Sequence, residues 1–270
     1  MKKFLAIMLV LILLISVVAC GKSDDTTGDE EAAATVVAEK DVYQPEDTDD
    51  KFGYAVNASG DYDIVSFESA DTMHKVTVPS EIDGIPVTGI ADEAFKSAWQ
   101  ITEIVIPDSV KTIGVAAFYD CKYLTKVDIS DSVTTIAAAA FKDCVALDNV
   151  TLPKSLVALG DGAFFGCKSL KKIAFTDKLT TVGAGAFQRC SALAEVTISA
   201  SVVEIKDGAF AECPALNSIE IPATVTTFGE YVFTTPAAGN ENFKIIAAAD
   251  SAAAAYATAN GYALEAPAAE

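Results

Sequence analysis

The chain is poor in the side chains that most active sites and nucleic-acid interfaces use. Its 270 residues include one histidine, one tryptophan, and 19 lysines and arginines against 38 acids, so the net charge is −19. A nucleic-acid partner requires clustered basic residues, and this balance argues against one. Because His74 is the only histidine, the sequence offers no recognisable Ser–His–Asp set. We therefore expect a protein that is not an enzyme.

Motifs for metals and nucleotides are missing as well. Five of the six cysteines follow one another at intervals of 23 residues, whereas metal ligands converge from short spacings such as C-x-x-C. The stretch GAGAFQ (residues 183–188) lacks the third glycine of a dinucleotide fingerprint and the lysine of a phosphate loop. We expect neither a metal nor a cofactor.

The first twenty residues have the pattern of a secretory leader. Lys2 and Lys3 precede an apolar run, residues 4–19, that is short for a membrane span and ends at Cys20. The ending VVAC, followed by glycine, resembles the lipobox of bacterial lipoproteins, in which the cysteine is acylated and becomes the new N-terminus. The resemblance implies a signal peptide over residues 1–20 and a lipid on Cys20 that anchors a secreted protein at the bacterial membrane or cell surface. An ordinary signal peptide with a chance cysteine and an uncleaved anchor helix remain alternatives.

An acidic segment follows the leader. Residues 21–51 contain eleven acids and three lysines and have little apolar material for a core. Such a composition is typical of a solvated, disordered tether. We expect this segment to hold the rest of the protein away from the bilayer.

The remaining chain repeats with a period of 23 residues. Phenylalanine occurs at 95, 118, 141, 164, 187, 210 and 233, and leucine or isoleucine follows six residues after each of the first six. A pair of apolar residues spaced by two comes next, as in Val127 and Ile129, which is the period of a half-buried strand. The AFxxC segment has the spacing of a short helical turn. Glycine recurs four residues before the phenylalanine, as at Gly160 and Gly183, and predicts a turn that tolerates left-handed backbone.

One such unit cannot bury its apolar side alone, so the repeats must stack. We predict a solenoid of parallel strands and short helical turns, capped at both ends. Its structural core comprises the repeat phenylalanines Phe118, Phe141, Phe164, Phe187 and Phe210 and the cysteines Cys121, Cys144, Cys167, Cys190 and Cys213. The cysteines are interpreted as small buried hydrophobes. Stacked positions lie within reach of a disulfide, and this possibility stays open.

The pattern LxxVxIxxSVxxIxxxAFxxC, as in residues 124–144, resembles the BspA-like class of bacterial leucine-rich repeats. The resemblance suggests an N-terminal cap with an irregular first repeat over residues 52–94, regular repeats over 95–236 and a C-terminal cap over 237–270. The stretch NASGD (residues 57–61) supplies turn residues for a hairpin in the first cap. A strand, a short helix from about Ser251 to Asn260 and a last strand are expected in the second cap.

Binding, if any, must use the polar surface. Outward strand positions are mixed in charge and lack aromatic residues, and threonines align on the second extended piece. The candidate binding surface consists of Glu103, Lys126, Asp128, Lys172, Glu195, Thr112, Thr135, Thr181 and Thr227. The family resemblance implies adhesion or interaction with an extracellular protein or cell-surface ligand. A carbohydrate-binding accessory lipoprotein and a passive envelope scaffold are the alternatives.

Overall fold

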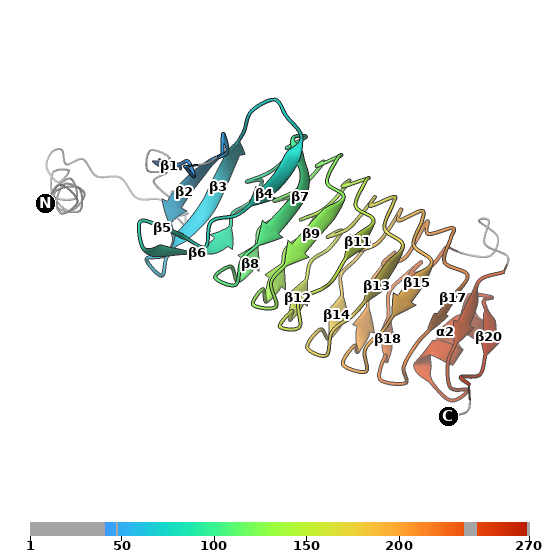
Figure 1. The fold of residues 1–270 in the computed structure, drawn as a ribbon. Coiled ribbons are helices and arrows are strands. Elements are labelled where there is room, and N and C mark those ends of the chain that lie inside the picture. The colour runs from blue at the N-terminus through green and yellow to red at the C-terminus, as the bar shows by residue number, and fades with distance from the viewer. Residues whose placement is uncertain (1–40, 47, 235–241, 269–270) are drawn as a thin grey trace, which may run out of the picture. The chain divides into compact units, whose positions relative to one another are not determined.

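The computed structural model describes residues 41–46, 48–234 and 242–268, which fall within a single compact unit, Ala38–Glu270. The predicted signal peptide, Cys20 and the tether up to residue 40 lie outside the described residues. Within the unit, short strands from successive coils stack in register, and each end of the stack is covered by a separate cap (Figure 1). The fold is the predicted parallel solenoid, with about nine turns and a repeat of about 23 residues.

The N-terminal cap begins earlier than the sequence predicted. Strand β1 (Asp41–Tyr43) pairs antiparallel with β2 (Lys51–Val56), and β2 forms a hairpin with β3 (Tyr62–Glu68) around the NASGD turn. The end of the predicted tether at residue 51 is therefore wrong. Tyr43 is the physical reason, because its ring packs against the core and brings an otherwise acidic segment into the sheet.

The irregular first coil connects this cap to the repeats. It contains β4 (His74–Thr77), β5 (Glu81–Ile82) and β6 (Ile85–Ile90). Strand β3 pairs in parallel with β6, which joins the hairpin to the stack. Asp83 and Gly84 form the tight β5–β6 turn, both with positive φ.

Two parallel ladders run along the coils. The main sheet is the ladder formed by β4, β7 (Ile101–Ile106), β9 (Lys126–Ile129), β11 (Asn149–Val150), β13 (Lys172–Ala174), β15 (Glu195–Thr197), β17 (Ser218–Glu220), β19 (Lys244–Ile246) and β20 (Ala263–Glu265). The second sheet begins with the antiparallel strands β1, β2 and β3. It continues in parallel with β6, β8 (Thr112–Ile113), β10 (Thr135–Ile136), β12 (Ala158–Leu159), β14 (Thr181–Val182), β16 (Glu204–Ile205) and β18 (Thr227–Phe228). Backbone pairing is interrupted between β11 and β13 and between β12 and β14.

The AFxxC segments form consecutive turns in place of the predicted helical turns. In one coil Ala116 and Asp120, two residues before and two after Phe118, have φ values of 52° and 61°. Left-handed residues at this spacing prevent a right-handed helix. The Phe118 amide donates to the carbonyl oxygen of Ala140 in the next coil at 2.7 Å, so these segments form a third ladder that ties the coils together.

The core is a column of stacked phenylalanine rings. Phe118, Phe141, Phe164 and Phe187 are fully buried, and Phe210 is 1% exposed. From Phe95 to Phe233, the centroids of consecutive rings lie 4.9–5.7 Å apart, and the planes of consecutive rings are inclined by 2° to 16°. The 23-residue period thus places identical rings on top of one another and fills the interior without interruption.

The glycines that precede the repeat phenylalanine by four residues serve a different purpose from the one predicted. None of them has positive φ. A Cβ atom at Gly160 would lie 2.3 Å from the amide nitrogen of Ala138 in the previous coil. At these glycines the backbones of adjacent coils approach closely, whereas other coils have Ala137 or Lys206 at the same position.

The C-terminal cap closes the core. It consists of β19, the helix α2 (Ala252–Ala259) and β20. Ser251 caps the helix, and its side chain accepts a hydrogen bond from the Ala254 amide. The Tyr262 hydroxyl donates to the Phe233 carbonyl oxygen at 3.0 Å, so the cap covers the last ring of the phenylalanine column.

Candidate functional site

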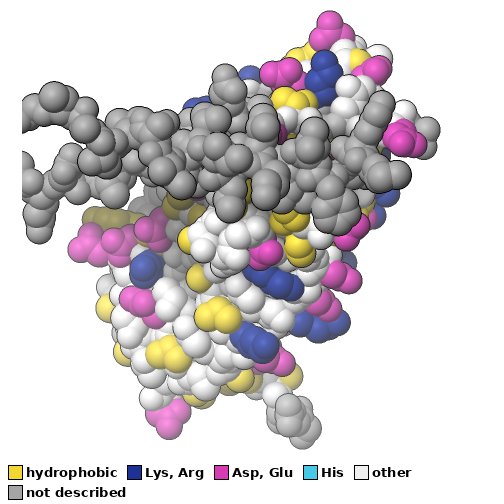
Figure 2. Space-filling model, turned by 90° about the vertical axis from the view of Figure 1, so that its left-hand side faces the viewer, with side chains coloured by type: hydrophobic (Ala, Val, Ile, Leu, Met, Phe, Trp, Pro, Cys, Tyr) yellow, Lys and Arg dark blue, Asp and Glu magenta, His cyan; other side chains and the backbone are white. Residues whose placement is uncertain are grey.

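Five of the predicted binding residues lie together on the main sheet. Strand register places Glu103 beside Lys126, and Lys172 beside Glu195. Asp128 lies on the same strand as Lys126 and pairs across with Val105. Figure 2 is drawn from the side on which the N-terminal cap lies in Figure 1, and acidic and basic side chains are interspersed in its visible part. We call the outward side of β7, β9, β11, β13 and β15 the main-sheet face.

The charged side chains on the main-sheet face differ in whether they have an ion-pair partner. Lys126 Nζ lies 2.9 Å from Asp128 Oδ2, and its hydrogen bond to Asp128 raises the pKa of the amine. Lys172 and Glu195 are exposed neighbours, and within the described residues neither forms an ion pair. Two unpaired opposite charges side by side leave both available to a ligand.

Open hollows follow this face from β7 to β15. One of about 470 Å³ is lined by residues of β7, β9 and β11, among them Lys126 and Asp128. Another of about 440 Å³ lies over the interruption between β11 and β13 and is lined by Lys172, Glu195 and Lys154 among others. A missing backbone pairing therefore coincides with the unpaired charges. The sequence does not show the interruption, because Thr151 and Leu152 keep the pattern of the repeat.

The four predicted threonines belong to a different surface. Thr112 pairs with Thr135, and Thr181 pairs through Glu204 with Thr227, all within the second sheet. In each coil a corner such as residues 107–111 separates the two sheets. The threonines consequently do not form one site with the charged residues. Thr181 Oγ1 makes a 3.5 Å contact with Glu204, which uses part of its hydrogen-bonding capacity inside the ladder.

The repeat cysteines are part of the buried core. All five are buried and free, with no disulfide among the described residues. Each Sγ donates to the carbonyl oxygen of a phenylalanine 26 residues earlier, as from Cys144 to Phe118 at 3.1 Å. Burial raises the pKa of Cys144 and Cys167 far above its ordinary value, and that of Cys213 to about 12. These three thiols therefore stay protonated.

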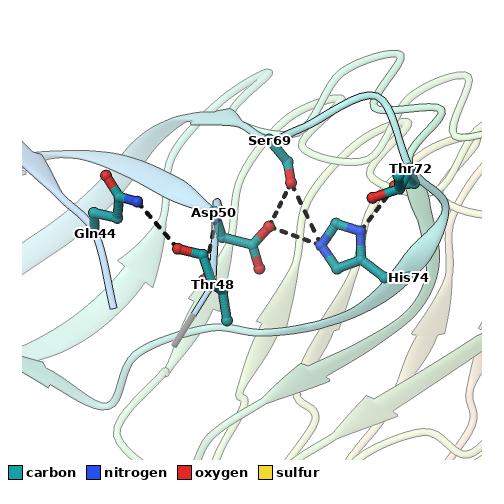
Figure 3. A network of polar contacts seen from close by, with 6 residues as sticks. All are labelled: Gln44, Thr48, Asp50, Ser69, Thr72 and His74. Atoms are coloured by element: carbon teal, nitrogen blue, oxygen red, sulfur yellow. Dashed lines mark hydrogen bonds and ion pairs between the residues drawn. The ribbon is translucent and has the colours of Figure 1, made fainter. Parts of the chain in front are cut away.

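One polar cluster was missed by sequence reasoning. Asp50, Ser69 and His74 converge in the N-terminal cap, where Asp50 Oδ1 lies 2.6 Å from Ser69 Oγ and 2.7 Å from His74 Nε2 (Figure 3). In a catalytic triad the serine and the aspartate contact opposite ring nitrogens. Here both contact Nε2, while Nδ1 faces the Thr72 carbonyl oxygen at 2.9 Å. This arrangement does not activate the serine as a nucleophile.

Two features are absent from the described residues. No group of three or more His, Cys, Asp or Glu side chains there could hold a metal ion. Nor does this part of the chain contain a helix of the length and apolar character that a membrane crossing requires.

Comparison with known proteins decides what the repeats are. Residues 88–202 match the family model described as the BspA type leucine rich repeat region, in six copies. These residues are thus similar to BspA-type leucine-rich repeats, and the solenoid has the leucine-rich-repeat fold. The match begins inside β6 and covers coils that carry the main-sheet face. No curated protein matches the chain.

The leucine-rich-repeat domain resembles several solved bacterial structures. A leucine rich repeat protein of T. pallidum is 27% identical, with a TM-score of 0.64 over 79% of this chain and 95% of that one. A leucine rich cell surface protein of Faecalibacterium prausnitzii is 28% identical, with a TM-score of 0.63 over 78% of this chain and 55% of that one. A leucine-rich repeat protein of Bacteroides ovatus is 27% identical, with a TM-score of 0.63, and the match covers 74% and 54% of the two chains. The match thus spans about half the length of the last two proteins.

Proposed function

We propose that this protein is a lipid-anchored bacterial surface protein whose leucine-rich-repeat domain binds a protein ligand through the main-sheet face. The observation that carries the proposal is the pair Lys172 and Glu195, exposed, adjacent and without ion-pair partners among the described residues, beside a hollow. A protein surface with the opposite order of charges would pair with both at once. The similarity to a cell surface protein of Faecalibacterium prausnitzii supports the location.

The lipid anchor is the part of the proposal that rests on sequence. Cys20 follows an apolar run directly, and the segment after it has the composition of a tether. With the acyl chain in the membrane, the acidic segment repels anionic lipids and keeps the repeats in solution. The main-sheet face would then be presented to molecules outside the cell.

The decisive experiment compares binding of charge-reversed variants. The full-length protein and its Lys126→Glu/Lys172→Glu variant are tested against immobilised matrix proteins, glycan arrays and whole cells. The control is Lys111→Glu/Lys206→Glu, which makes the same change in net charge at exposed residues outside the main sheet. We expect saturable binding to a protein that weakens about tenfold or more in the first variant and is unchanged in the control.

Other outcomes contradict the proposal in distinguishable ways. Binding to glycans alone would favour a carbohydrate-binding accessory protein. Absence of binding to any surface would favour a passive scaffold. Equal loss of binding in both variants would show that net charge, and not the main-sheet face, governs the interaction.

A further inference from the structure

A buried carboxylate lies where the N-terminal cap meets the first coil. Asp50 is 3% exposed and is the one buried charged residue of the described part of the chain. It comes from the segment between β1 and β2, and its carboxylate contacts Ser69 in the β3–β4 loop and His74, the first residue of β4. The Asp50 amide donates to Thr48 Oγ1 at 3.1 Å, which extends the network along the same segment (Figure 3).

The surroundings of His74 favour the protonated ring. Nδ1 faces the Thr72 carbonyl oxygen at 2.9 Å, and Nε2 faces the Asp50 carboxylate at 2.7 Å. Both of these oxygens only accept hydrogen bonds, so a ring with two N–H groups satisfies both. A neutral ring has one N–H, and one of its nitrogens must then point a lone pair at an oxygen.

We propose that the contact between His74 and Asp50 is a pH-sensitive clamp, which holds the segment between β1 and β2 against the start of β4 when the ring is protonated and loosens when the ring is neutral. The Ser69 hydroxyl has a role in both states. It donates to Asp50 in the closed state and lies 3.4 Å from Nε2, within reach of that nitrogen once the proton is gone.

The direction of the pH effect follows from the charges around the ring. Burial lowers the pKa of His74, but the hydrogen bonds with Thr72 and Asp50 and the charge of Asp50 outweigh it and raise the pKa above 6.5. Of the ionisable residues around the ring, only Asp50 contributes to this rise. The other charged residues on the adjoining elements include Glu46, Asp49, Lys51, Asp63, Glu68, Asp71, Lys75 and Glu103.

Because the pKa of His74 is raised in the folded state, the stabilisation that the clamp provides decreases as the pH rises. The stabilisation of the clamp is fully present below pH 6.5, the ordinary histidine value, and is lost as the pH rises through the pKa of folded His74. The clamp is therefore closed in acid and loosens toward alkaline pH. Its release frees residues 48–50, which lie directly before β2 and the buried Phe52.

The single histidine makes the test direct. NMR of the full-length protein labelled at histidine gives one ring signal, whose chemical shift is followed against pH. Amide hydrogen exchange of residues 48–50 and 69–74, corrected for the intrinsic rate, reports opening of the clamp. We expect titration above pH 6.5 and opening that increases with pH, by at most about tenfold for each unit between 6.5 and that pKa.

Two variants test the residues themselves. His74→Gln retains an amide donor but cannot titrate, and we expect the pH dependence of exchange to disappear. Asp50→Asn should lower the pKa of His74, whereas Asp49→Asn, a change at the exposed neighbour, should leave it unaltered. Titration of the wild-type ring at or below pH 6.5, or opening that does not change with pH, would overturn the proposal. Neither result depends on whether the main-sheet face binds a ligand.

Discussion

Cys144 Sγ donates a hydrogen bond to the carbonyl oxygen of Phe118 across the boundary between two coils, at 3.1 Å. The same contact recurs at all five repeat cysteines. The Phe118 carbonyl oxygen also accepts a hydrogen bond from the Cys121 amide at 3.3 Å, so the thiol adds a second donor from the next coil. The cysteine of the repeat therefore links neighbouring coils through a weak donor small enough to fit beside the stacked rings.

The buried thiols should be inert in the native protein. Burial raises the pKa of Cys144, Cys167, Cys190 and Cys213, that of Cys213 to about 12, so these four carry little thiolate at neutral pH. We expect a thiol reagent to modify none of the five in the folded state and all five after denaturation. Mass spectrometry of the peptides provides the count. Rapid native labelling of Cys144 would contradict the packing described above.

Phe164→Ala should destabilise the domain severely. The ring is fully buried between Phe141 and Phe187, and removing a large core side chain costs about 3–5 kcal/mol. The matched control is Phe165→Ala, because this adjacent ring lies at the surface under Lys142, 4.8 Å from its centroid. The control should cost about 1 kcal/mol or less. Urea denaturation measures both, and similar losses would show that the phenylalanine column is not the core.

The left-handed turns can be tested by adding glycine. Ala139 has φ 54°, a conformation that costs an alanine about 1–2 kcal/mol. Ala139→Gly should therefore raise the free energy of unfolding by up to about 1 kcal/mol, after the entropy of the more flexible unfolded chain is subtracted.

The neighbouring Ala140 provides the contrast. It is fully buried and does not have positive φ, so Ala140→Gly should lower the stability by about 1 kcal/mol. If both changes destabilise the protein equally, the segment is not built from the alternating turns seen here.

Cys20→Ala should separate the protein from the membrane. Alanine has no thiol that could accept an acyl group, so the variant would carry no lipid at residue 20. We expect it to appear in the soluble or secreted fraction with an unchanged circular dichroism spectrum. Fractionation followed by immunoblotting measures this. A processed variant that stays in the membrane fraction would show that Cys20 is not the anchor.

Much of the fold could be predicted because the repeat is exact. A step of 23 residues between Phe118 and Phe141, kept from coil to coil, allows only stacked coils with one shared core. The main-sheet residues Lys126 and Lys172 could be predicted from alternation along each strand for the same reason. Which charges remain unpaired could not, because that depends on side-chain geometry and on the interruption between β11 and β13.

The sequence by itself determined the solenoid, its register and its core, since periodicity states which residues of each coil point inward. Only the tertiary structure decided the conformation of the AFxxC segments and the cluster at Asp50 and His74. Hydrogen bonds to the next coil hold residues such as Ala116 in a left-handed conformation that their side chains do not favour. Asp50 and His74 are 24 residues apart in a part of the chain without repeats, and they meet because the antiparallel hairpin of β2 and β3 brings its two ends together.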